Sequence, residues 1–140
     1  MPVRYQIDKA NGLIRTRCVG DVTVQEVVDH FQTLAQDPDC PDYLDVLLDL
    51  SKQTSLPQSD ELREVTEAIR RVRDRVRFGY CAIVASTDAL FGMLRMFQVF
   101  TEDLFGEAHV YRSMADAEGW LVARRAGERK HDRSGMSRST

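Results

Sequence analysis

Apolar and polar positions along the chain follow two alternating periods. Strand-like runs occupy Tyr5–Ile7 and Leu13–Val19, and the Asn11-Gly12 pair between them favours the positive φ of a chain reversal. These runs predict an antiparallel hairpin. After the hairpin, Thr23 and Glu26 form a T-x-x-E capping box, and apolar residues then recur at helical spacing. The pattern predicts a first helix that ends before the prolines at positions 38 and 41.

Strands and helices alternate through the rest of the chain. The pattern predicts a buried strand over Leu44–Leu50, a helix from Ser59 to Arg77 and a second buried strand over Tyr80–Ala85. It then predicts a helix over residues 88–105, which Ser86 or Thr87 caps and Gly106 ends. A short strand over Ala108–Tyr111 and a last helix from Ser113 complete the order. Such alternation is typical of an α/β fold. We therefore expect a mostly parallel sheet of about five strands, with an N-terminal antiparallel hairpin and four helices.

The helix predicted over residues 88–105 carries more apolar side chains than one buried face requires. At 100° per residue, eight of them fill about half of its circumference, and Phe91 and Val99 fall outside that arc. A helix of this kind is covered by more than its own sheet, so a second subunit, a protein partner or a ligand is expected. The predicted contact surface consists of Phe91, Met93, Met96, Phe97, Val99 and Phe100.

Composition and charge narrow the class of protein. The 140 residues are 43% hydrophobic and 29% charged, which is typical of a single soluble globular domain. Residues 124–140 hold six Lys or Arg and two Asp or Glu, whereas residues 1–123 hold 13 basic and 20 acidic residues. We expect a domain over residues 1–123 and a basic, disordered tail over residues 124–140. The acidic body disfavours nucleic acid, and the lack of a long apolar run or signal sequence predicts a cytoplasmic protein without a membrane span.

The chain contains none of the common nucleotide-binding, hydrolase or zinc-protease motifs. His30 falls on the charged side of the first helix, His109 begins a short strand and His131 lies in the tail, so a metal site or a catalytic triad is not expected. No pair of cysteines has metal-binding spacing, and Cys40, in a Pro-flanked loop, is predicted to be the most exposed of the three. We predict a non-enzymatic protein without cofactor or metal.

The order of elements and four short segments resemble the SpoIIAA-like family, which includes STAS domains and their STAS/SEC14-like bacterial relatives. The segments are Val46-Leu47-Leu48-Asp49-Leu50-Ser51, Tyr80-Cys81-Ala82-Ile83-Val84-Ala85, Val110-Tyr111-Arg112-Ser113 and Ala117-Glu118-Gly119-Trp120-Leu121. The resemblance spans Arg4 to about Ala123. It implies a single-domain, non-enzymatic module that binds proteins or small apolar or anionic ligands, often as a homodimer.

Two further expectations come from this resemblance. In the anti-sigma antagonist branch a partner kinase phosphorylates the second serine of Asp-Ser-Ser-Gly, and an ungapped match places Ser59 at that serine. Pro57, Gln58 and Asp60 depart from the motif, and Ser59 is also interpretable as the N-cap of its helix. The SEC14-like branch implies lipid binding, with Phe91, Met93, Met96, Phe97 and Phe100 as candidate pocket residues.

Three functional hypotheses follow. The leading hypothesis is a STAS-like interaction or regulatory module that forms a homodimer through the helix at residues 88–105. The alternative is a small apolar-ligand or lipid-binding protein of SEC14-like type. A remote alternative is an enzyme acting through Asp49, which lies at the carboxyl end of a predicted central strand, where open α/β sheets place ligands. A lone carboxylate at a strand end is more often a cap for the loop that follows it.

Overall fold

The computed structural model describes the backbone of residues 2–135 and the side chains of residues 2–127. A five-stranded sheet has the order β1 (Val3–Asp8), β2 (Leu13–Gly20), β3 (Tyr43–Gln53), β4 (Arg77–Val84) and β5 (Glu107–Tyr111), with β1–β2 antiparallel and the remaining pairs parallel. The helices are α1 (Val24–Gln36), α2 (Ser59–Arg71), α3 (Asp88–Phe100) and α4 (Met114–Gly135). The predicted α/β class, element order and mixed sheet are confirmed.

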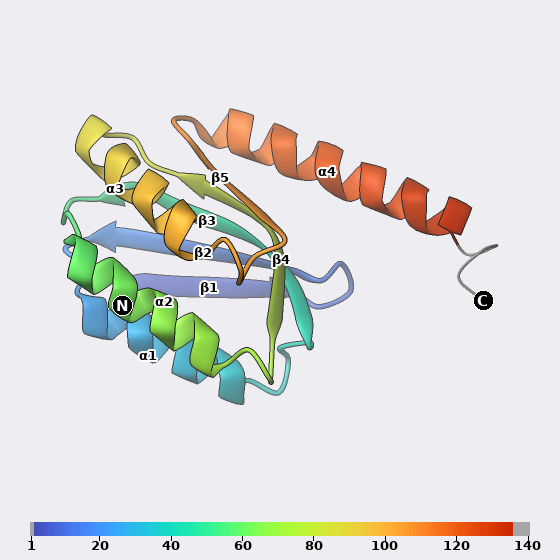
Figure 1. Cartoon of the computed structure of the whole chain (residues 1–140), viewed down its shortest axis with the longest axis horizontal. Helices are drawn as coiled ribbons and strands as arrows, with labels where there is room; N and C mark the ends of the chain where they lie inside the picture. The colour runs from blue at the N-terminus through green and yellow to red at the C-terminus, as the bar shows by residue number, and fades with distance from the viewer. Residues whose placement is uncertain (1, 136–140) are drawn as a thin grey trace.

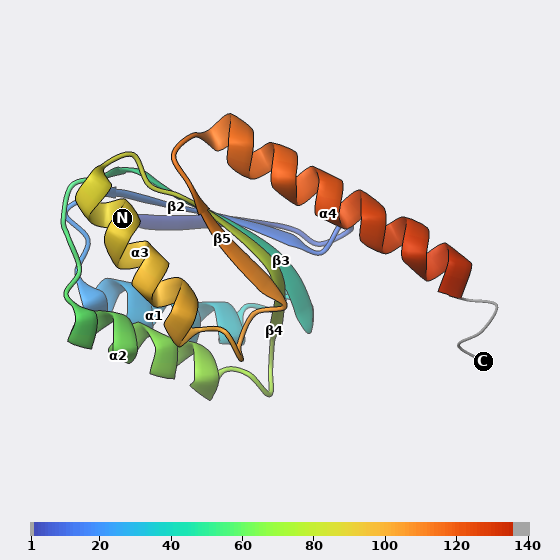
Figure 2. The same cartoon turned by 45° about the horizontal axis from the view of Figure 1, so that its top comes forward.

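The helices cover the two faces of the sheet unequally. Helices α1, α2 and α3 lie on one face and α4 lies on the other, where its carboxyl-terminal half extends past the strands (Figures 1 and 2). Because side chains alternate along a strand, Ile14 of β2 joins the larger core under α1–α3, and Leu13 joins a smaller core under α4. Each face therefore has its own hydrophobic core.

Local signals in the sequence produce the predicted hairpin and the first helix cap. Gly12 adopts φ +62°, and the Asp8 carboxylate accepts hydrogen bonds from the backbone and side chain of Asn11. At the start of α1, the Thr23 hydroxyl accepts from the Glu26 N–H, while the Glu26 carboxylate accepts from the Thr23 N–H. Both features were predicted and both are confirmed.

Two helices are shorter than predicted. Helix α2 ends at Arg71, not Arg77, and a turn over residues 72–75, in which the Arg75 N–H donates to the Val72 carbonyl at 2.9 Å, leads to the start of β4 at Arg77. Helix α3 ends at Phe100, not at residue 105, although its predicted cap by Thr87 is confirmed. After Phe100 the chain continues as a turn, in which the fully buried Thr101 hydroxyl donates to the Phe97 carbonyl and the Leu104 N–H donates to the Thr101 carbonyl at 2.9 Å.

Helix α4 continues past Arg124, where a disordered tail was predicted, and reaches Gly135. The Arg125 side chain is the physical reason, since it pairs with the Asp45 carboxylate and donates to the carbonyls of Asn11 and Gly12. The sequence near Arg125 is also rich in Ala and Arg, which favour helix. Residues 136–140 of the predicted tail lie outside the described residues.

Cys40 is buried rather than exposed. The Arg75 guanidinium donates to the carbonyls of Asp37 at 3.2 Å and Cys40 at 2.6 Å, and this holds the Pro-flanked loop against the core. Burial raises the pKa of the Cys40 thiol. The loop composition therefore gave the wrong expectation for its exposure.

Candidate functional site

The six residues predicted as one contact surface on α3 do not lie on one surface. Phe97 is 5% exposed and belongs to the core, and Phe91, Met93 and Phe100 are half-buried. Met96 is 39% exposed and Val99 is 65% exposed. A contiguous Phe/Met surface is therefore wrong, and only a small patch of two side chains is open to solvent.

Arginine side chains from neighbouring elements cover part of the excess apolar surface of α3. The Arg112 guanidinium lies 4.5 Å from the centre of the Phe91 ring, and Arg63 of α2 lies 4.3 Å from that of Phe100. Both distances suit cation–π contacts, and the long aliphatic part of an arginine also covers apolar surface. A hydropathy pattern counts these arginines only as polar residues. It therefore overestimates the apolar surface of α3 that a partner would have to cover.

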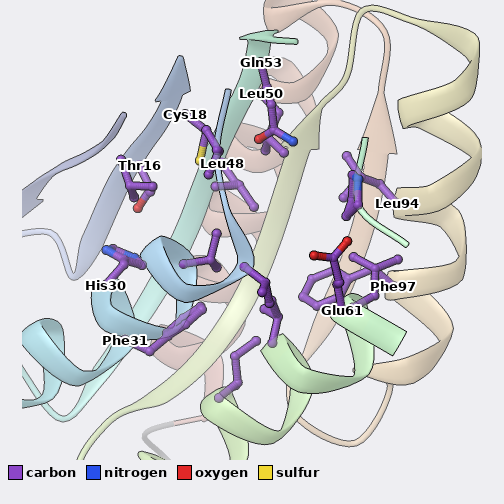
Figure 3. Close-up of a pocket in the computed structure, with 18 of the residues that line it drawn as sticks. Thr16, Cys18, His30, Phe31, Leu48, Leu50, Gln53, Glu61, Leu94 and Phe97 are labelled. Atoms are coloured by element: carbon purple, nitrogen blue, oxygen red, sulfur yellow. The ribbon is translucent and has the colours of Figure 1, made fainter. Parts of the chain in front are cut away.

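A cavity lies between α1, α2 and the sheet (Figure 3). Its volume is about 390 Å³ and most of its lining is apolar. Of the α3 residues predicted to line an apolar pocket, Phe97 does and the other four do not. The remaining lining comes mainly from segments that the sequence analysis did not single out, namely Thr16, Cys18, Val22, Val24, Val27, His30, Phe31, Leu48, Leu50, Leu56, Leu62 and Val65.

Leu48 shows that the sheet is incompletely covered at the pocket. It lies on the central strand β3, under the helical face, and is nevertheless only half-buried. The lining residues that are exposed are Asp21, Thr23, Gln25 and Leu56, from the segments that follow β2 and β3. The pocket therefore opens at the carboxyl ends of these parallel strands, where open α/β sheets commonly bind ligands.

A serine joins the two loops at this opening. The Ser55 hydroxyl accepts from the Val22 N–H at 2.9 Å and donates to the Val22 carbonyl at 3.0 Å. Beside it, the Thr54 N–H donates to the Gly20 carbonyl at 2.9 Å. These bonds fix the position of the β2–α1 loop relative to the β3–α2 loop, so they define one edge of the opening.

Carboxylates occupy the N-termini of both helices at the opening. Glu26 accepts from the Thr23 N–H of α1, and Glu61 accepts from the Gln58 N–H of α2, each at 2.9 Å. Free helix N-termini attract anions, but here an internal negative charge already satisfies them. Asp21 and Glu61 also line the pocket, whereas no Lys or Arg among the described side chains does. The opening therefore disfavours negatively charged groups.

The uncharged polar side chains that line the pocket include Thr16 and His30. Thr16 is 4% exposed, and its hydroxyl forms no hydrogen bond with any of residues 2–127. Since no fully enclosed side-chain oxygen among those residues lacks a partner, this hydroxyl must reach the pocket space. Figure 3 shows it directed toward the side where the His30 ring lies.

His30 is half-buried in the pocket wall, not at the charged surface where it was expected. It follows Val27 by three residues and precedes Leu34 by four, so it lies at the border of the apolar face of α1. Its ring packs edge-on against Tyr5 and Phe31, with centroids 5.2 and 5.0 Å away. Burial lowers the pKa of His30 to about 4, so the imidazole is neutral near pH 7.

The other two predicted positions lie outside the pocket lining. Asp49 accepts hydrogen bonds from the N–H and hydroxyl of Ser51, at 2.9 and 2.6 Å, and lies 3.9 Å from the Arg17 guanidinium. Asp49 was expected at the end of its strand, but β3 continues to Gln53, so this carboxylate bonds Ser51 within the strand, at the register shift between β2 and β3, and does not cap the following loop. Ser59 is exposed and is the first residue of α2, whose N-cap is Gln58, so the interpretation of Ser59 as the N-cap is wrong by one residue.

The described residues contain neither a cluster of metal-ligating side chains nor a helix suited to span a membrane. No group of three His, Cys, Asp or Glu side chains there comes together in a way that could hold a metal ion. Among residues 2–135, no helix combines the length and apolar character needed to cross a bilayer.

Comparison with known proteins adds no family assignment. No protein-family model matches the chain, and its sequence matches no curated protein. The resemblance to SpoIIAA-like domains therefore stays a prediction, and the function must be argued from the pocket itself.

Proposed function

We propose that this protein is a non-enzymatic binding module that holds a small apolar molecule in the pocket between α1, α2 and the sheet. The observation that carries the proposal is the cavity of about 390 Å³, lined mostly by apolar side chains and open at the carboxyl ends of β2 and β3. Ligand pockets in proteins have volumes of about 300–1,000 Å³, whereas close-packed cores contain few voids larger than a water molecule. The proposal is thus the apolar-ligand alternative from the sequence, at a pocket to which only Phe97 of the residues named for it contributes.

The most direct test fills the pocket. Leu48→Trp places an indole in the cavity, which has room for it, and we expect the variant to fold and to lose binding of a neutral apolar dye such as Nile red. Val122→Trp is the matched control, because Val122 is 64% exposed on α4 and lies outside the pocket. Native mass spectrometry of gently purified protein should also show a bound small molecule in the unmodified chain. Retention of dye binding by a folded Leu48→Trp variant would contradict the proposal.

The predicted homodimer is the second candidate. It is supported by Met96 and Val99, which are exposed one turn apart on α3, but the surrounding Phe side chains are buried or covered by arginine. Val99→Asp should lower the association constant measured by sedimentation, whereas Val122→Asp, at an equally exposed position on α4, should not. A monomer at high micromolar concentration that neither substitution alters would refute a dimer through α3.

An enzyme acting through Asp49 has the least support, because that carboxylate lies outside the pocket lining and is engaged by Ser51 and Arg17. A protein partner, phosphorylation of Ser59 and a cytoplasmic location stay predictions from the sequence.

A further inference from the structure

The polar groups that line the pocket indicate which class of ligand it can bind. The walls are apolar, but the hydroxyl of Thr16 faces the cavity with no hydrogen-bond partner among residues 2–127. Because this hydroxyl reaches the pocket space and has no protein partner there, it is available to hydrogen-bond a polar group that enters the pocket. The neighbouring wall supplies His30, whose imidazole offers one donor and one acceptor in its neutral form.

The charged residues at the pocket also indicate an uncharged ligand. Its lining includes Asp21 and Glu61 but no described Lys or Arg, and its one imidazole is held neutral by burial. The helix N-termini at the opening are already engaged by Glu26 and Glu61. Lys52, the nearest basic residue before the β3–α2 loop, is exposed and outside the lining. A carboxylate or phosphate entering the pocket would lose its hydration and gain no cation.

We infer that the pocket selects a neutral amphiphile, meaning an apolar chain or ring that carries an uncharged hydroxyl or carbonyl group, and rejects fatty-acid and phosphate anions. This inference rests on the proposed function and adds the chemical class of the ligand. The Thr16 hydroxyl and the His30 ring would hydrogen-bond the polar group inside the pocket. Asp21 and Glu61 would repel anions at the opening.

The test uses three probes with the same ten-carbon chain, namely decanol, decanoate and decylammonium, in competition with Nile red at pH 7.5. We expect decanol to bind at least about tenfold more tightly than decanoate. Thr16→Val should weaken decanol about fivefold, the usual effect of one lost hydrogen bond, and leave decanoate unchanged. Thr66→Val is the control, since Thr66 is buried on α2, bonds the Leu62 carbonyl and lies outside the pocket lining.

The possible results separate this inference from the proposed function. Equal affinity for decanol and decanoate would overturn the inference and leave an apolar-ligand pocket in place. Tightest binding of decylammonium would also overturn it, because the carboxylates at the opening would then dominate recognition. Failure of all three probes and of the dye to bind would instead refute the proposed function. If Thr16→Val and Thr66→Val changed decanol affinity equally, the Thr16 hydroxyl would have no specific role in ligand binding.

Discussion

Arg125 of α4 and Asp45 of β3 form an ion pair across 80 residues of sequence. Their side chains are 15% and 9% exposed, so the pair is largely removed from water. The same guanidinium donates to the carbonyls of Asn11 and Gly12, and the Asp45 carboxylate also accepts from the Tyr80 N–H. This pair therefore joins the last helix, the hairpin turn and two central strands.

Removal of one partner should be costly. Arg125→Met leaves the Asp45 charge without a cation, and we expect the free energy of unfolding to fall by about 3 kcal/mol in urea titrations. The double variant Asp45→Asn/Arg125→Met removes both charges but keeps an acceptor for the Tyr80 N–H, so it should recover at least half of the loss. Arg124→Met is the control, because Arg124 is about half exposed in its pair with Glu107 and should contribute less than about 1 kcal/mol. Equal effects at positions 124 and 125 would contradict the anchoring role.

Gly79 lies against this ion pair, and a larger residue there should disturb it. A Cβ at position 79 would lie 1.9 Å from the Tyr43 hydroxyl and 2.4 Å from Asp45 Oδ1. Gly79→Ala should therefore lower the free energy of unfolding by about 1–3 kcal/mol, since Tyr43 and the paired carboxylate must both move. Gly92→Ala, within α3, meets no atom within 4 Å and should raise stability by about 0.5–1 kcal/mol. Thermal unfolding of the two variants should thus shift in opposite directions.

The fold could be predicted from the sequence because its signals are local. The Asn11-Gly12 reversal, the Thr23–Glu26 capping box and the alternation of periods each depend on residues close together in the chain. Helix ends were predicted less well, because they depend on distant contacts. Arg125, for example, holds the extension of α4 in place through a contact with Asp45, which lies 80 residues away in the sequence.

The sequence did not predict the pocket at its actual position. A cavity forms where side chains from facing elements leave space between them unfilled, and this depends on the three-dimensional structure. Val24 and Val27 of α1 line it together with Thr16 and Cys18 of β2, and all four side chains are short. Helical periodicity marks the two valines as core positions without showing how far they reach. The pocket does open at the carboxyl ends of parallel strands, the edge at which Asp49 was expected, but Asp49 itself lies outside the lining.

His30 should make stability depend on pH in a defined window. Its pKa is lowered by burial from 6.5 to about 4, so between these values the unfolded chain binds the proton that the folded chain rejects. The free energy of unfolding should therefore fall as the pH is lowered from 6.5 to 4, by at most about 3 kcal/mol, and His30→Gln should abolish this dependence. His109→Gln is the control and should preserve it. The carboxylates of Asp8, Asp37 and Asp103, whose pKa values are lowered from 3.8, act at lower pH.

Ser55 should control the motion of the pocket opening. Ser55→Ala removes both hydrogen bonds to Val22, and we expect the Val22 amide to exchange its hydrogen about fivefold faster, as measured by NMR. The Thr54 N–H, bonded to the Gly20 carbonyl, is an internal reference and should change less. Ser51→Ala is the matched control, since the Ser51 hydroxyl bonds Asp49 instead of the opposite loop. If the two serine variants gave the same Val22 exchange rate, the opening would be held by the backbone bond of Thr54 alone, and Ser55 would have no specific role in holding the two loops together.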